Sequence, residues 1–315
     1  MTTNPSGRQA HLAAYRQDLT VVEVGGGIRS YQVGGDDILD GFSQDEICPA
    51  GSGQLLAPWP NRLGDGRFEW NGTAYQTAIT EVAKNNAIHG LVRWANWILP
   101  EPESLHSPWT PGTPAEHLIV SHRLYPQPGW PWALEMRVAY RLGEHGLDVR
   151  TWATNLSEEP CPIGLGWHPY LKAPGGRVDD VTLRIQAHTA YVCDERGLPT
   201  GRIRVEGTAL DFSEAKRIGS LVLDTALTDL ERDSTGRATV EMASGNGRTI
   251  RLWMSHQYTH LMLFTGDTIH DQARRRRSLA VEPMTAAPDM LRSGDGLKVL
   301  DPGETFEATW GIQVF

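Results

Sequence analysis

The chain has 315 residues and a formal net charge of −9, with 40% hydrophobic and 21% charged residues. This composition is typical of a globular protein, and no apolar run approaches the length of about 18 residues that a membrane span requires. The acidic balance also argues against nucleic acid as a partner, because such binding depends on Lys and Arg that neutralise phosphates.

Two further features bear on the cellular compartment and on disulfide and metal binding. Residues 1–8 are polar and lack the apolar segment of a secretory signal, so we expect a cytoplasmic protein. The three cysteines, Cys48, Cys161 and Cys193, lie far apart and have no C-x-x-C spacing. They predict neither a disulfide framework nor a thiolate zinc site.

The first predicted elements are two strands, at residues 20–24 and 28–33, with three glycines at 25–27 between them. A phosphate-binding loop of the dinucleotide type would require a helix immediately after the glycines. The following residues instead have the composition of a strand, so a hairpin turn is predicted.

The next two segments place an arginine and a histidine near turns. Residues 58–62 read Pro-Trp-Pro-Asn-Arg, and the prolines stiffen the approach to Arg62, whose guanidinium offers a rigid fork of donors. Residues 64–72 read as turn, strand and turn, which places Arg62 at a strand end. His89 precedes Gly90 after a polar loop at 84–86, so its imidazole is expected to project from a turn. The same sequence pattern would also be found if Arg62 and His89 had only structural roles.

Alternation of apolar and polar residues with a period of two dominates the rest of the chain. It is clearest at 134–142 and recurs at 147–153, 181–185, 250–254 and 306–314. No stretch of comparable length has a helical period, and 33 Gly and 20 Pro separate the short strands. Residues 100–114, the only linker-like stretch, are predicted to be a surface loop. We therefore predict a single all-β domain over residues 1–315, a large antiparallel β-sandwich.

Two more titratable residues precede prolines. His168 comes before Pro169 and Glu282 before Pro283, and a following proline keeps each backbone extended. An anionic carboxylate and a proton-bearing imidazole, held apart on opposite sides of one C–O unit, can exchange two protons with it. Asp224 and Asp229 lie in an otherwise neutral stretch, and either could accept hydrogen bonds from substrate hydroxyls or cap a turn.

Tryptophans and an arginine run complete the candidate features. Several of the 11 tryptophans adjoin the motifs, among them Trp59, Trp94 and Trp167, and a flat aromatic face packs well against a sugar ring. Core packing is the alternative for each of them. The run of four arginines at 274–277 could form a nucleic-acid patch, but in an acidic chain it is predicted to be a solvated loop.

The ordered motifs at 58–62, 86–90, 166–170 and 281–283, followed by those at 294–297 and 302–306, resemble the aldose 1-epimerase (galactose mutarotase) family, in particular its bacterial branch. The resemblance spans nearly the whole chain. It implies a single large antiparallel β-sandwich with an open cleft that acts on free sugars without cofactor. We expect no metal, and a monomer or homodimer.

The resemblance also implies roles for individual residues. Glu282 matches the general base that deprotonates the anomeric hydroxyl, and His168 matches the general acid that protonates the ring oxygen. His89 matches a histidine near the ring oxygen, and Arg62 matches an arginine that grips the substrate. Many family members have an Asp-His pair that binds a sugar hydroxyl, whereas this chain has Asp224-Thr225, so the sugar and the choice between Asp224 and Asp229 stay open. Trp167 is a candidate substrate contact from its aromatic face alone.

Three alternatives remain. His89, His168 and Glu282 could form a two-histidine, one-carboxylate metal site, although no close H-x-H or H-x-D pair supports it. A non-catalytic sugar-binding module would need neither Glu282 nor His168. A hexose-phosphate epimerase would need several basic residues at the pocket, where Arg62 and Arg93 are the evident ones.

Overall fold

The computed structural model describes residues 4–100, 117–173, 175–243 and 247–315. Strands account for 49% of the chain and helices for 5%, which confirms the all-β prediction. Apart from Pro100, the predicted surface loop at 100–114 lies outside the described residues. Within the described ranges, no helix combines the length and the apolar character needed to cross a lipid bilayer.

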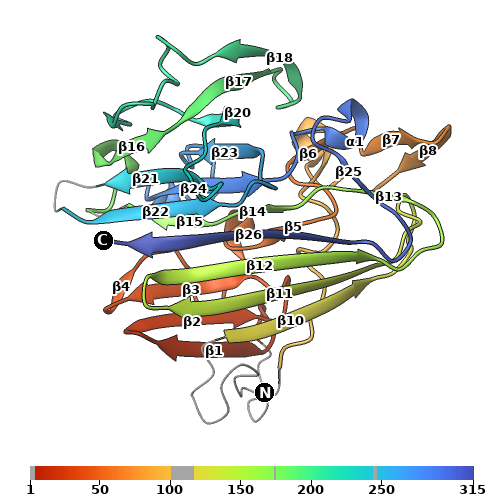
Figure 1. Cartoon of the computed structure of the whole chain (residues 1–315), viewed down its shortest axis with the longest axis horizontal. Coiled ribbons are helices and arrows are strands. Elements are labelled where there is room, and N and C mark those ends of the chain that lie inside the picture. The colour runs from red at the N-terminus through yellow and green to blue at the C-terminus, as the bar shows by residue number, and fades with distance from the viewer. Residues whose placement is uncertain (1–3, 101–116, 174, 244–246) are drawn as a thin grey trace.

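Two large antiparallel sheets form the body of the fold (Figure 1). The first sheet has the strand order β10 (His117–Leu124), β11 (Leu134–Gly143), β12 (Gly146–Asn155), β26 (Thr305–Val314), β22 (Thr249–Met254), β21 (Ala238–Ala243), β16 (Thr182–Ile185) and β19 (Lys216–Arg217). The second has the order β18 (Pro199–Arg204), β17 (Ala187–Cys193), β20 (Asp224–Leu230), β23 (His260–Phe264), β24 (Ser278–Met284), β14 (Gly166–Trp167) and β5 (Leu55–Leu56), and β15 (Tyr170–Lys172) also pairs with β24.

Smaller elements surround these sheets. One four-stranded sheet contains β1 (Gln9–Ala14), β2 (Gln17–Val22), β3 (Ile28–Val33) and β4 (Asp36–Asp37), and three strand pairs join β6 (Arg62–Gly64) to β9 (Asn86–Ile88), β7 (Arg67–Trp70) to β8 (Thr73–Gln76) and β13 (Cys161–Ile163) to β25 (Lys298–Leu300). The described helices are η1 (Pro49–Gly51), η2 (Val82–Lys84), η4 (Val178–Asp180), η5 (Gln272–Arg274) and α1 (Met290–Ser293). No described helix has more than four residues, as the lack of helical periodicity predicted.

The core lies between the two large sheets, and the period of two explains why. Along β11, buried residues alternate with partly or fully exposed ones, so one face of the strand packs inward. The ring of Trp167 on β14 lies 5.7 Å from that of Trp310 on β26 and 6.0 Å from that of Tyr140 on β11. These contacts join the second sheet to the first across the apolar layer.

Most of the predicted strands are confirmed, and one loop prediction is wrong. The hairpin around residues 25–27 forms between β2 and β3, although β2 ends at Val22. The arginine run at 274–277 is not simply solvated. The side chains of Arg274 and Arg276 are only 11% exposed, and their guanidinium groups pair with Glu46, Asp179 and Asp267. Carboxylates from distant segments thus pair with arginine side chains that, from the local sequence, were expected to face water.

Candidate active site

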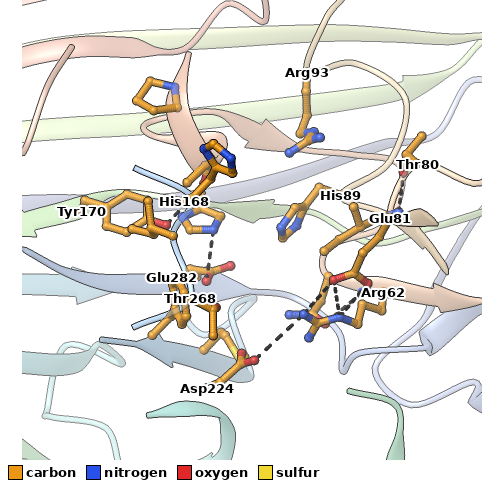
Figure 2. Close-up of a pocket in the computed structure, with 18 of the residues that line it drawn as sticks. Arg62, Thr80, Glu81, His89, Arg93, His168, Tyr170, Asp224, Thr268 and Glu282 are labelled. Atoms are coloured by element: carbon orange, nitrogen blue, oxygen red, sulfur yellow. Dashed lines mark hydrogen bonds and ion pairs between the residues drawn. The ribbon is translucent and has the colours of Figure 1, made fainter. Parts of the chain in front are cut away.

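A cleft of about 500 Å³ opens over the second sheet, beside the β6–β9 pair. It brings together five of the predicted site residues, Arg62, His89, His168, Asp224 and Glu282 (Figure 2). Its other lining residues are Pro49, Ala50, Asn61, Thr80, Glu81, Ile88, Arg93, Tyr170, Met262, Phe264, Thr268, Ile269, His270 and Asp271. Aromatic, apolar and polar groups thus face one space, as in many sites for small molecules.

Two of the titratable groups face this cleft because side chains alternate between the two sides of an extended backbone. On β24, Val281 belongs to the hydrophobic core, and the next residue, Glu282, projects to the opposite side and lines the cleft. At the end of β14, Trp167 packs between the sheets, and His168 after it lines the cleft. Successive side chains of extended backbone point to opposite faces, so each chemical group is backed by a core residue.

His89 is held by an unusual backbone conformation directly after β9. Its φ of 64° lies in the left-handed region, which is uncommon for residues other than glycine, and its backbone N–H donates to the carbonyl of Asn61 at 2.8 Å. Gly90 also has a positive φ of 70°, and a Cβ there would lie 1.9 Å from the carbonyl oxygen of Ala57. Such strain persists where surrounding structure enforces it, and it is often found at functional sites.

Three ionisable side chains meet at the floor of the cleft. Oε1 of Glu282 lies 3.4 Å from Nε2 of His168, and the rings of His168 and His89 lie 5.3 Å apart at an angle of 76°. Glu282, His168 and His89 are only 2%, 4% and 7% exposed. Within the described residues, Oε2 of Glu282 and Nδ1 of both histidines are buried without a hydrogen-bond partner. Buried polar atoms are normally paired, so these three indicate a place for a polar ligand.

Burial shifts the proton affinities of the pair in opposite directions. It raises the pKa of Glu282 well above its usual value, and nearby Asp224 adds to the rise. For His168, burial and the charge of Arg93 lower the pKa to about 3. Burial likewise holds the pKa of His89 well below its usual value. Both shifts favour the arrangement in which the carboxyl group of Glu282, and not the imidazole of His168, carries a proton.

Arg62 lies at the start of β6, as predicted, and is held in a fixed orientation. Its guanidinium donates to Glu81 through Nε, at 3.0 Å from Oε2, and through Nη2, at 3.0 Å from Oε1. Nη2 also lies 3.9 Å from the carboxylate of Asp224 at the start of β20. Two parallel bonds leave the fork little freedom, so the remaining donors are presented to the cleft in a defined geometry.

Two predicted contacts lie elsewhere. Asp229 does not line the cleft, and its carboxylate accepts a hydrogen bond from Thr189. Trp167 is completely buried, and its Nε1 donates to Oγ1 of Thr151 at 3.1 Å. Trp59 is also buried, while the exposed Trp94 lies outside the lining of the cleft. Of the two aspartates left open by the sequence, Asp224 is therefore the one at the cleft.

Three of the lining residues outside the predicted site contact or adjoin the predicted side chains. Tyr170 stacks on His168, with ring centres 4.9 Å apart and an angle of 22°, and its position in the motif at 166–170 was a usable signal. Glu81 orients Arg62, but no local pattern marks it as the partner. Arg93 also faces the cleft, as Figure 2 shows. It was noted in the sequence only as a basic residue close to the motifs.

The same three groups could also hold a metal ion. One ligand atom from each of His89, His168 and Glu282 lies within 4.8 Å of the others. Two histidines and one carboxylate form a donor set that suits iron and other first-row transition metals. The geometry is therefore compatible with a bound cation as well as with proton transfer.

Comparison with known proteins identifies the family. The family model described as aldose 1-epimerase matches residues 14–313. The chain belongs to the aldose 1-epimerase family. Among family relatives, it is 29% identical over 309 residues to the uncharacterized protein YihR of Escherichia coli K12, covering 98% of this chain and 93% of that protein.

Solved structures share the aldose 1-epimerase fold. A GalM/aldose epimerase homologue from C. elegans superimposes with a TM-score of 0.83 at 18% identity, covering 98% of each chain. A galactose mutarotase-like protein from Clostridium acetobutylicum gives a TM-score of 0.82 at 20% identity, covering 97% of this chain and 94% of that one. At such identities the likeness establishes the fold, a large antiparallel β-sandwich, and not the substrate.

Proposed function

We propose that the protein is a mutarotase, which interconverts the α and β anomers of a free aldose by opening and closing its ring. The observation that carries this proposal is the 3.4 Å contact between Glu282 and His168 inside a cleft where both retain unpaired buried atoms. Ring opening must remove a proton from the anomeric hydroxyl and deliver one to the ring oxygen. Those two oxygens are bonded to the same carbon, so a pair of adjacent acid and base groups can serve both.

The mechanism follows from the single proton that the pair holds. Family resemblance assigns the base role to Glu282 and the acid role to His168. This requires the proton on His168, whereas burial, which raises the pKa of Glu282 and lowers that of His168, favours the proton on Glu282. The two arrangements have the same total charge and differ by one transfer across the contact. A sugar hydroxyl that donates to the carboxylate, with the charge of Arg62 nearby, favours the ionised form of Glu282.

The remaining steps use the same groups. With the proton on His168, Glu282 accepts the proton of the anomeric hydroxyl while His168 protonates the ring oxygen, and the C1 to ring-oxygen bond breaks. Rotation about the C1–C2 bond presents the other face of the aldehyde. Closure with the roles reversed then yields the other anomer. The substrate undergoes no net oxidation or reduction, so these steps need no redox group from the protein.

The proposal is tested by proton NMR of aldoses with and without the protein. Freshly dissolved pure anomers should reach equilibrium faster, and exchange spectroscopy at equilibrium should show cross-peaks between anomers. Glu282→Gln should slow exchange by about 10²- to 10⁴-fold, the usual contribution of a general acid or base. Sugar binding, followed by calorimetry, should persist in this variant. Glu135→Gln on β11, outside the cleft, is the matched control. Unchanged exchange in Glu282→Gln would exclude Glu282 as the proton carrier.

A metal-dependent enzyme is the second candidate, because three ligand atoms of suitable type lie within 4.8 Å of one another. Elemental analysis of the purified protein distinguishes the two. This candidate would be supported by a stoichiometric transition metal whose removal by a chelator abolishes activity and whose return restores activity. Full anomer exchange in metal-free protein would support proton transfer by the side chains alone.

A further inference from the structure

Arg93 is the feature of the cleft that this mechanism leaves without a role. Its guanidinium lines the cleft beside His89 and His168 (Figure 2). Among the described residues it has no hydrogen-bond or ion-pair partner for its side chain. Arg62, the other arginine of the cleft, is bonded twice to Glu81.

The side chain of Arg93 is also partly buried. Burial lowers the pKa of Arg93 below its usual value, and no carboxylate offsets this effect. Nearby Cys48 offsets the effect of burial only in part, and the guanidinium lies over the ring of Trp94, whose centre is 5.5 Å from Cζ. A partly buried charge without a counter-ion is unfavourable unless a ligand supplies the opposite charge.

Arg93 and Arg62 lie on opposite sides of the catalytic pair. The charge of Arg93 acts on both His89 and His168, and the charge of Arg62 acts on His89 and on Glu282 but not on His168. Figure 2 shows the same division, with Arg93 above the two imidazoles and with Arg62 and Asp224 below them. The cleft therefore has an imidazole side with an unpaired cation and a carboxylate side with a paired one.

A glycine, Gly51, lets the side chains of Arg93 and His168 both approach its backbone closely. A Cβ added to Gly51 would lie 3.2 Å from Cδ2 of His168 and 3.5 Å from Nη1 of Arg93. The two side chains thus border one point that any other residue at position 51 would fill. Gly51 also has a φ of 76°, which disfavours such residues.

The connectivity of a pyranose then specifies which part of the sugar faces Arg93. The ring oxygen is bonded to C1 on one side and to C5 on the other, and C5 carries C6. If His168 protonates the ring oxygen, the substituent at C6 is directed toward the imidazole side of the cleft. We propose that the substrate is an aldose with an anionic group at C6, a carboxylate, phosphate or sulfonate, and that Arg93 binds this anion. This inference rests on the proposed function, because it uses the orientation that ring opening requires.

The test compares sugars that differ only at C6. Anomer exchange is measured by NMR for glucose, glucuronate, glucose 6-phosphate and glucose with a sulfonate at C6. We expect at least one anionic sugar to exceed glucose in kcat/KM by about 10-fold or more, since charge-assisted bonds to Arg are stronger than neutral ones. The three anionic sugars distinguish the carboxylate, phosphate and sulfonate forms of the proposal.

Variants of Arg93 link this preference to the residue. Arg93→Gln should lower the ratio of kcat/KM between the anionic sugar and glucose by about 10- to 100-fold, and Arg93→Lys should give an intermediate ratio. Arg150→Gln on β12 removes one positive charge outside the cleft and should leave the ratio unchanged. Circular dichroism verifies that each variant is folded.

A measurement on the wild-type protein covers the case in which Arg93→Gln does not fold. Rising ionic strength should increase KM for the anionic sugar more than for glucose, because salt screens the pairing. Three results would overturn the inference and leave the mutarotase proposal standing. They are equal or better turnover of glucose, a kcat/KM ratio between the two sugars that Arg93→Gln does not change, and equal effects of salt on KM for both sugars. Failure to accelerate exchange of any sugar would instead refute the mutarotase proposal itself.

Discussion

Oε1 of Glu282 on β24 and Nε2 of His168, which directly follows β14, lie 3.4 Å apart although the two residues are distant in the chain. Gly166 on β14 pairs with Met284 on β24, and this register sets the two side chains next to each other. Their contact means that they titrate as a pair and not as two independent groups. The dependence of activity on pH should therefore reflect the proton that they share.

The first prediction concerns that pH dependence. The active pair holds one proton, so activity falls when a second proton binds or when the first is lost. Because the pKa of His168 is lowered to about 3, His168 should give no inflection near 6.5, where an ordinary histidine titrates, and because the pKa of Glu282 is raised, the shared proton should be lost above the usual range of a glutamate. The measurement is a pH–rate profile by NMR exchange, with circular dichroism at each pH to detect unfolding.

A control separates this pair from other histidines. His188 is half exposed and bonded to Glu231, outside the cleft, so His188→Gln should leave the profile unchanged. An inflection near 6.5 that persists in His188→Gln would show that a histidine with an ordinary pKa limits activity.

The second prediction is that Glu282→Gln is more stable than the wild type at neutral and alkaline pH. The carboxyl group has a raised pKa in the folded state, so wild-type stability falls as pH rises from the unfolded pKa through the folded one. Glutamine never ionises and avoids this loss. We expect a gain of about 1 kcal/mol, within the range seen when a functional residue is removed.

Urea unfolding at two pH values measures this effect. The difference between Glu282→Gln and the wild type should be small at acidic pH and should grow toward alkaline pH. A difference that shrinks as pH rises would mean that the ionised carboxylate is stabilised in the fold.

The sequence predicted the strands well because a period of two is a local signal. β11, β12 and β26 each have ten residues, long enough for the alternation to be visible. The site was predicted from motifs, which hold Arg62 and His89 next to turns. The same alternation also bears on Trp167, because it and His168 are neighbours on extended backbone and cannot both face one cleft.

Other features depend on contacts between distant segments, and local patterns do not contain them. Arg62 and Glu81 meet because β6 and β9 pair, and the partners of the arginine run come from the segments around Asp40 and Asp179. β14 has only two residues, too few to show any period. The lack of a side-chain hydrogen-bond or ion-pair partner for Arg93 among the described residues is likewise a property of the folded chain.

The third prediction concerns the fork of Arg62. Arg62→Lys keeps the charge but replaces a planar group that bonds to Glu81 through two nitrogens. The new ammonium has no fixed orientation, so substrate positioning should suffer, and we expect kcat/KM to fall about 10-fold or more. Steady-state exchange rates over a range of sugar concentrations measure the change. Arg150→Lys on β12 is the matched control, and an equal effect in both variants would contradict a positioning role.

The fourth prediction concerns a buried carboxylate that anchors the strands beneath the site. Asp40 accepts hydrogen bonds from Arg277 at 2.7 and 3.0 Å and from Ser278 at 3.0 Å, and it pairs with Lys172 at 3.2 Å. Ser278 begins β24, and Lys172 ends β15. Burial acts to raise the pKa of Asp40, but bonds from Arg277 and the charge of Lys172 outweigh it, so the net shift is downward.

Asp40→Asn should therefore lose about 3 kcal/mol of stability, since it leaves two cations near a neutral amide. The contribution of Asp40 is present above its unfolded pKa and disappears as pH falls through its lowered folded pKa, so the gap to wild type should narrow in acid. Urea unfolding at neutral and acidic pH measures this. Asp36→Asn, a change at an exposed aspartate of β4, should shift stability by less than about 0.5 kcal/mol. If both variants lost equal stability, the buried cluster would not be the anchor of β24, and the placement of Glu282 would have to depend on the register with β14 and β23 alone.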